Sequence, residues 1–161
     1  MGTTLPGKVT DAPLSEVEKK VFPQELEAIK LAETARDYSG AKQLLDKVIA
    51  TCPTYSSAYN NRAQLYRLLG DRDLALADAN EAIRHARQNY RPSVLRLALC
   101  QRGILRREGG HPEEAFNDFE EAGKLGLEDA RKMAVACNPY AKLCNSIVQE
   151  MLDKLYYSLQ Q

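Results

Sequence analysis

The feature that most constrains this chain is a set of small residues that recurs at long, nearly regular intervals. Gly70 divides residues 56–87 into two helical runs, which carry the small residues Ala63, Ala75, Ala79 and Ala82. Glycine adopts a positive φ just past a helix end without steric cost, so this segment predicts two antiparallel helices joined by a tight turn. Small residues let the two helices approach closely. A single hairpin buries little apolar surface, so the pattern demands neighbouring hairpins.

The same pattern recurs on both sides of this segment. Thirty-four residues earlier, Ala41 and Val48 take the places of Ala75 and Ala82. Forty residues later, the equivalent positions are filled by Gly103, Ala115, Phe119 and Ala122. The six extra residues of the second interval are expected to lengthen the first helix of the third unit by one to two turns. The sequence therefore predicts an all-α solenoid of three stacked helical hairpins, at about 22–55, 56–89 and 96–129.

The N-terminal unit fits the pattern least well. Residues 1–14 are rich in Pro, Gly and Thr and are expected to form a flexible lead. Ser15 and Glu18 form a capping-box pattern that begins a short helix, and Pro23 is expected to restart it. Ile29 stands where the later units have alanine or glycine, which predicts a wider or displaced helix crossing.

After residue 130 the repeat ends, and residues 131–161 are predicted to form C-terminal capping helices. Asn138 and Pro139 are helix-start signals. Apolar residues then follow at helical spacing, at Tyr140, Leu143, Cys144, Ile147, Met151, Leu155 and Leu159. We expect this last helix to dock on the third unit and to cover Phe116 and Phe119, because terminal repeats need a cap. The alternative is a helix that folds into a groove or binds a partner.

The net charge is zero, but the charge is unevenly distributed. Residues 62–107 hold ten arginines and four acidic residues, a net charge of +6, whereas residues 108–161 carry a net charge of −5. Arginine recognises carboxylates and phosphates through two parallel hydrogen bonds, so this stretch could serve a binding site. Exposed helical faces rich in arginine are the simpler interpretation, and we favour it.

The sequence carries no recognisable catalytic, metal or cofactor motif. His85 is expected on the surface of a repeat helix and His111 in a turn, with no metal-ligand spacing around either. The sequence contains no run of 18 apolar residues, which is about the length that a membrane-spanning helix needs. The cysteines show no C-x-x-C pairing and are expected to be buried free thiols in a reducing compartment, the cytoplasm: Cys52, Cys100, Cys137 and Cys144. We therefore predict a protein that is not an enzyme and needs no cofactor.

A stack of helical hairpins offers a concave groove lined by the first helix of each unit. Helical spacing predicts that this partner-binding groove is lined by Lys30, Asn60, Asn61, Gln64, Arg67, Gln101, Ile104 and Arg107. Asparagine and glutamine side chains both donate and accept hydrogen bonds, so they can bind the backbone of an extended peptide.

These motifs resemble the tetratricopeptide-repeat (TPR) family over residues 22–130. Tyr59, Ala63 and Tyr66, followed by Ala75 and Ala82, match the spacing of its W-x2-L-G-x2-Y…A…A pattern. Four segments resemble small three-repeat members of the family: VFPQ (21–24), AYNNRAQ (58–64), QRGIL (101–105) and NPYAKLCN (138–145). The resemblance implies an interaction adaptor whose partners are other proteins, with the Hsp70 chaperone or a client peptide among them.

Chaperone-binding members of this family grip an acidic C-terminal tail with a clamp of two lysines, two asparagines and an arginine. Carried over position by position, only Asn61 matches that clamp, and the other places hold Leu26, Lys30, Leu97 and Gln101. The resemblance therefore implies that any Hsp70 contact uses another surface. Two alternatives remain: a nucleic-acid-binding module that uses residues 62–107, and an accessory subunit of an enzyme. Nucleic acid is the less favoured partner, because Tyr59 and Tyr66 are expected to pack within the repeat.

Overall fold

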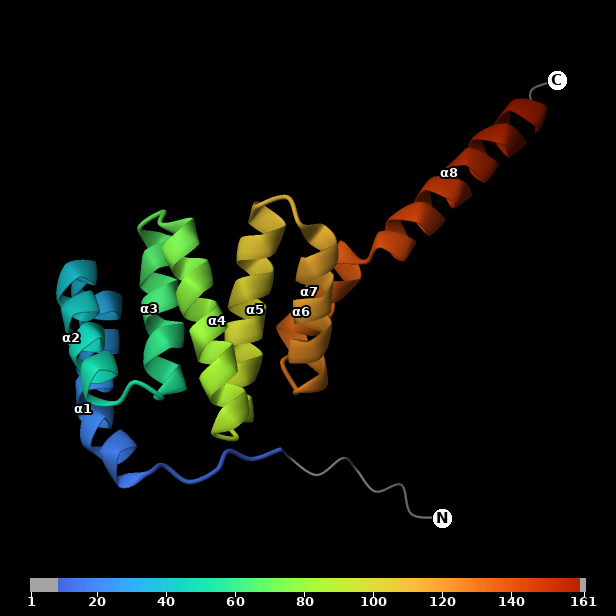
Figure 1. Cartoon of the computed structure of the whole chain (residues 1–161). Helices are drawn as coiled ribbons and strands as arrows, with labels where there is room; N and C mark the ends of the chain where they lie inside the picture. The colour runs from blue at the N-terminus through green and yellow to red at the C-terminus, as the bar shows by residue number, and fades with distance from the viewer. Residues whose placement is uncertain (1–8, 160–161) are drawn as a thin grey trace, which may run out of the picture.

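The computed structural model describes residues 9–159, except for the side chains of Pro139 and residues 141–145. The described residues form eight α-helices and one π-helical turn, with no strand among them: α1 (Glu16–Lys30), η1 (Leu31–Ala35), α2 (Tyr38–Thr51), α3 (Ser56–Leu68), α4 (Arg72–Gln88), α5 (Pro92–Glu108), α6 (Pro112–Lys124), α7 (Glu128–Cys137) and α8 (Pro139–Leu159). Helices α1/α2, α3/α4 and α5/α6 pair as antiparallel hairpins that stack side by side (Figure 1). The predicted all-α solenoid of three hairpins is confirmed.

The small residues of the repeat lie at the helix crossings, as predicted. Ala63, Ala75 and Ala82 are completely buried between α3 and α4 and their neighbours. In the next hairpin, Gly103 lies against the fully buried ring of Phe119, and a Cβ atom at Gly103 would lie 2.6 Å from Cε1 of that ring. The hairpin therefore needs a residue without a side chain at this crossing.

The extra residues between the second and third units lengthen two helices. Compared with α2, α4 is longer by three residues at its C-terminal end, and compared with α3, α5 begins four residues earlier. The connection between α4 and α5 is one residue shorter than the one between α2 and α3, which accounts for the six inserted residues. The predicted extension of the third unit's first helix is confirmed as one turn, and the rest lies in α4.

The first hairpin differs from the sequence prediction at its start. A single helix runs through Pro23 without a restart, and the Ser15–Glu18 capping box begins it. The helix ends in the π-helical turn η1, after which Arg36 adopts a left-handed conformation with φ of 51°. A wider turn of this kind changes the direction in which the following side chains point. Ile29 is only half-buried, whereas the equivalent Ala63 is completely buried, which agrees with a looser first crossing.

The segment before α1 is held against the middle of the stack. Residues 1–8 of the expected flexible lead lie outside the described residues. From there the chain runs below the hairpins to the α4–α5 connection, where the Ala12 amide donates to the Tyr90 carbonyl at 2.9 Å (Figure 1). Arg91 donates to the carbonyls of Ala12 and Pro13 and binds the Glu18 carboxylate at 2.8 Å, with both charged side chains buried. These contacts tie residues 9–14 to the third hairpin.

The two C-terminal helices behave differently. Helix α7 covers α6, and Ala134 and Cys137 of α7 pack with Phe119, while Phe116 lies at the edge of the same cluster. The expectation that α8 docks on the third unit and covers both phenylalanines is wrong, because α8 extends away from the stack (Figure 1). All of its residues from 146 to 159 are exposed. Helix α7, rather than α8, covers the apolar end of the last hairpin.

Candidate functional site

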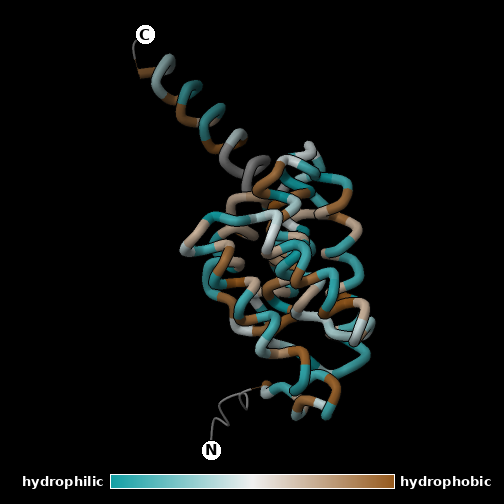
Figure 2. Tube along the Cα trace, turned by 90° about the vertical axis from the view of Figure 1, so that its left-hand side faces the viewer, coloured by the Kyte–Doolittle hydropathy of each residue, from teal (hydrophilic) through white to brown (hydrophobic). Residues whose placement is uncertain are grey.

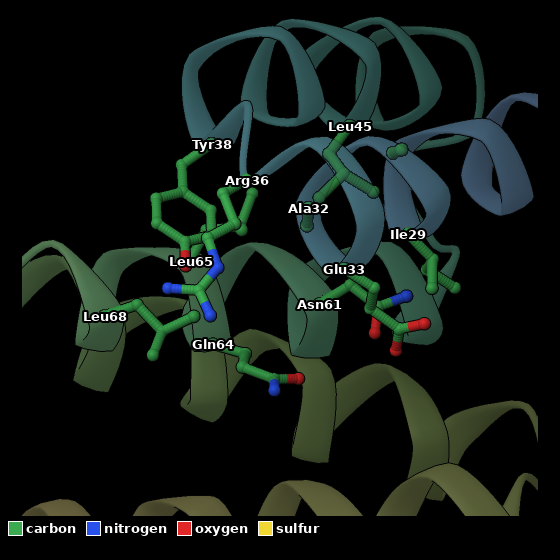
Figure 3. Close-up of a pocket in the computed structure, with 11 residues that line it drawn as sticks. Ile29, Ala32, Glu33, Arg36, Tyr38, Leu45, Asn61, Gln64, Leu65 and Leu68 are labelled. Carbon is green, nitrogen blue, oxygen red and sulfur yellow. The ribbon is translucent and has the colours of Figure 1, made fainter.

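A cleft of about 480 Å³ lies between the first hairpin and α3. Its apolar side chains come from both walls: Ala28, Ile29, Ala32, Leu45, Leu65 and Leu68. Glu33, Arg36, Asn61 and Gln64 add polar groups, and Figure 3 shows the Arg36 side chain reaching from the first hairpin towards α3. The cleft is lined in part by Ile29 at the end of α1 and by Ala32 and Glu33 of η1. It can hold one large apolar side chain beside hydrogen-bonding and charged groups.

One wall of the cleft is fixed by a buried carboxylate. Glu25 is 2% exposed and accepts hydrogen bonds from the Tyr55 hydroxyl at 2.5 Å, from the Asn61 amide at 2.7 Å and from the Ser57 hydroxyl. Burial, together with this hydrogen bond to Glu25, raises the pKa of Tyr55 well above its ordinary value, so the phenol stays protonated. Asn61 lines the cleft, as predicted, but its amide group already donates to Glu25.

The predicted groove residues on α3 and α5 are joined directly. The Gln101 amide donates to the Asn60 carbonyl at 3.0 Å, which links the two helices, and Gln101 is buried by this contact. Ile104 is half-buried against the cluster that contains Phe119. Gln101 and Ile104 thus contribute to packing between helices, and Gln64 on α3 is exposed. Lys30 is exposed at the end of α1 and is not part of the cleft lining.

Arg67 and Arg107 occupy equivalent places on α3 and α5, forty residues apart. Among the described residues neither forms an ion pair, and the buried Nε of Arg67 has no hydrogen-bond partner. Both lie near Cys100, where burial raises the pKa of the thiol and the two arginines act in the opposite direction. The Arg107 guanidinium also lies 5.9 Å from the centre of the Phe119 ring. Together with Arg36 of the cleft, which also has no ion pair among the described residues, these two arginines are available to an acidic ligand.

Most of the arginine-rich stretch is paired within the protein. Of its ten arginines, six bind carboxylates: Arg62, Arg84, Arg87, Arg91, Arg102 and Arg106. Arg72 donates to the Leu105 carbonyl at 3.2 Å. Tyr59 is buried, and its hydroxyl donates to the Pro53 carbonyl at 2.8 Å. A continuous basic face with stacking aromatic rings, which a nucleic-acid site needs, is not found over these residues.

The expectation that His85 lies on the surface of its helix is wrong, because the side chain is buried. Its ring is stacked on Tyr59 with ring centres 5.3 Å apart, and it is 5% exposed. Burial lowers the pKa of His85, and Arg84 lowers it further. Helical spacing relates His85 only to residues of its own helix, such as Glu81 and Ala82. It gives no indication that the ring meets Tyr59 of another helix. Cys52 and Cys137 are buried free thiols, as expected, and Cys100 is half-buried.

The described part of the chain contains no cluster of histidine, cysteine, aspartate or glutamate side chains that could hold a metal ion. None of the described helices combines the length and hydropathy that crossing a membrane requires.

Comparisons with known proteins agree with this architecture. The tetratricopeptide repeat family model matches residues 44–78, and the model of anaphase-promoting complex subunit 5 matches residues 88–142. Among solved structures, the first TPR of Spaghetti (RPAP3), solved with an HSP90 peptide, superposes with a TM-score of 0.64 at 22% identity, covering 81% of this chain and 95% of that one. The N-terminal domain of stress-induced protein-1 from C. elegans has a TM-score of 0.65 at 15% identity, covering 77% and 98%.

Curated relatives are closer in sequence. Tetratricopeptide repeat protein 36 of Danio rerio is 45% identical over 140 residues, which cover 87% of this chain and 73% of the relative. The Homo sapiens protein of that name is 40% identical over 147 residues, covering 86% and 76%. The Mus musculus protein is 37% identical over 162 residues, covering 92% and 86%. The chain belongs to the tetratricopeptide repeat protein 36 family.

Proposed function

We propose that this protein is a non-catalytic adaptor that binds an extended segment of another protein in the groove along α1, α3 and α5. The observation that carries the proposal is the 480 Å³ cleft, whose lining includes the exposed side chains of Gln64 on α3 and Arg36 after η1. The same fold in the first TPR of Spaghetti was solved with a bound HSP90 peptide, so a TPR stack of this size can hold a peptide. Aliphatic side chains, amides and arginines line the groove, and this composition suits binding rather than catalysis.

The chemistry of the groove indicates what kind of segment it takes. A bulky apolar side chain of the partner fits the cleft beside Leu65 and Leu68. Acidic side chains of the same segment would pair with Arg67 and Arg107, which have no carboxylate partner within the described structure. Backbone groups of the segment can bond to Gln64, which is exposed between these two features.

A chaperone of the Hsp70 class is the partner that the family resemblance suggests. The positions that would hold clamp lysines carry Leu26 and Leu97, which are exposed and apolar. The one matching residue, Asn61, already donates to Glu25 at 2.7 Å. Both features weaken the grip on a C-terminal carboxylate. We therefore propose that an Hsp70 contact relies on an internal segment, or on another surface, rather than on the acidic tail.

Fluorescence polarisation with labelled peptides tests this part of the proposal. The acidic peptide SRMEEVD, which the Spaghetti TPR binds, should bind this protein more weakly than about 100 μM, an affinity of roughly −5.5 kcal/mol. Low-micromolar binding of the peptide would contradict this part of the proposal.

A pull-down from cytosol tests the adaptor proposal itself. Proteins retained by the wild type should be lost from an Arg67→Ala, Arg107→Ala variant, because both substitutions remove groove cations without touching an ion pair. Lys47→Ala, an exposed position on α2, is the matched control and should retain them. Retention by all three proteins would place binding elsewhere. Asn61 is unsuitable for this test on its own, because its substitution also disturbs the Glu25 network.

The cytoplasm remains a prediction as the compartment in which this protein works.

A further inference from the structure

Helix α8 carries a continuous stripe of large apolar side chains that the rest of the chain leaves uncovered. Val148, Met151, Leu152 and Leu155 follow one another at intervals of three, one and three residues, and Leu159 continues the row by one turn. These five side chains are between 53% and 78% exposed. Figure 2 shows hydrophobic residues recurring along α8, which stands clear of the stack. This spacing places the side chains on one face of the helix, as in the seam of a helix pair.

The described charged side chains of α8, Glu150, Asp153 and Lys154, lie off the centre of the stripe and have partners within the helix. Lys154 binds Glu150 at 2.8 Å, and the Gln149 amide donates to Asp153 at 3.0 Å, both within the helix. The side chains of Val148, Met151, Leu152 and Leu155 also form a shallow groove, to which Lys154 and Ser158 add a polar edge. The stripe therefore holds no charge that calls for an opposite charge on its partner. Its best complement is another uncharged apolar helix face with the same spacing.

We propose that this stripe is a dimerisation surface, on which α8 of a second copy of the chain packs. A second copy supplies an uncharged apolar stripe of identical length and spacing, and two-fold pairing of identical surfaces is the commonest form of association. Six exposed apolar side chains, the five above and Ile147, would each bury about 100 Å². Two copies would then bury roughly 1,200 Å² in total, the lower end of the range for specific dimers.

The position of α8 allows this pairing without obstruction. The helix leaves the end of α7 and extends beyond the three hairpins, so two copies can join there while their stacks stay apart (Figure 1). The proposed groove lies on α1, α3 and α5 and is not covered by such a contact. A dimer would carry two grooves, which would raise the apparent affinity for a partner that offers two binding segments. The inference does not depend on the proposed function.

Sedimentation equilibrium of the full chain between about 1 and 100 μM tests the proposal, over the affinity range of a small interface. The wild type should change from the 18.0 kDa monomer to twice that mass across this range. A Met151→Glu, Leu155→Glu variant puts two charges into the stripe and should weaken the association at least about tenfold. Tyr157→Glu is the matched control: Tyr157 is equally exposed but lies on the opposite side of α8, and its variant should associate like the wild type.

Three results would overturn the proposal. One is a wild type that stays monomeric at every concentration, whether α8 is then free, folded back on the stack or reserved for a different protein. A second is a Met151→Glu, Leu155→Glu variant that associates as strongly as the wild type. A third is equal loss of association in the Tyr157→Glu control. Far-UV circular dichroism of each variant, with unchanged helix content, ensures that a loss of association is not a loss of α8.

Discussion

Arg62 binds Asp78 through two parallel hydrogen bonds, and forty residues later Arg102 binds Asp118 in the same way. The Nε and Nη2 atoms of Arg62 lie 2.6 and 2.8 Å from the two carboxylate oxygens, and those of Arg102 lie 3.0 and 2.7 Å away. The third nitrogen of each arginine reaches the previous hairpin, at Asp46 in one case and Asn80 in the other. Each arginine thus ties together three helices, two from its own hairpin and one from the preceding hairpin.

This arrangement predicts a large cost for removing one carboxylate. Asp118 is 3% exposed and accepts from Arg102 and Arg106, so Asp118→Ala removes the buried carboxylate that both partly buried guanidinium groups bind. We expect a loss of about 3 kcal/mol in the free energy of unfolding. Glu120→Ala removes an exposed ion pair on the same helix and should cost less than about 0.5 kcal/mol. Urea denaturation measures both. Equal midpoints for the two variants would show that the arginine contacts do not hold the hairpins together.

Gly103→Ala is expected to destabilise the third hairpin. The added methyl group would meet the buried Phe119 ring at 2.6 Å, and we expect a cost of about 1–3 kcal/mol despite the better helix propensity of alanine. Asn117→Ala, at an exposed position of α6, is the control and should leave the stability nearly unchanged. Thermal unfolding of both variants checks the prediction, and a stabilised Gly103→Ala protein would refute the close crossing.

Glu25→Ala should destabilise the first hairpin and change the titration of Tyr55. The substitution leaves the buried donors of Tyr55 and Asn61 without an acceptor, which should cost about 3 kcal/mol. Glu27→Ala, exposed on the same helix, should cost less than about 0.5 kcal/mol. Because Glu25 is one of the groups that raise the pKa of Tyr55, its removal should lower that pKa. Ultraviolet titration of the tyrosines measures this shift, and an unchanged titration curve would contradict the network.

The buried imidazole of His85 predicts a loss of stability in mild acid. Its pKa in the folded protein lies below the ordinary 6.5, so below that pH the unfolded chain binds more protons than the folded one. Stability should fall as the pH drops through 6.5, by at most about 1.4 kcal/mol per pH unit, and the slope should flatten below the folded pKa. Denaturation between pH 7.5 and 5.5 measures this. His85→Gln should abolish the slope, whereas His111→Gln, in an exposed turn, should leave it unchanged.

The repeat and the three hairpins could be predicted from the sequence, because helix crossings of this kind need small residues and only a few positions can hold them. Ala63, Ala75 and Gly103 therefore mark the packing directly. The buried polar residues could not be predicted in this way. The capping-box pattern gives Glu18 only a local role, and helical spacing does not mark Glu25 as buried. Their partners Arg91 and Tyr55 lie 73 and 30 residues away, and only the folded chain brings them together.

Helix α8 shows a second limit of sequence patterns. The periodicity of Ile147, Met151 and Leu155 correctly predicts an apolar face, but it cannot tell which surface that face meets. The same is true of the groove. Helical spacing placed Asn61 and Gln64 on one wall, while the other wall includes residues of η1 and the left-handed Arg36, which no periodicity reveals.

Site-specific photo-crosslinking from the groove tests the central claim, that this protein binds its partner along α1, α3 and α5. A benzophenone amino acid is placed at Gln64 in the groove or at Lys47 on the exposed side of α2, and each protein is irradiated in cytosol. If the groove is the binding site, one and the same partner is captured from Gln64 and not from Lys47, and an added Arg67→Ala, Arg107→Ala substitution removes the Gln64 product. Capture of that partner from Lys47 alone, or a Gln64 product that persists without the two arginines, would contradict it.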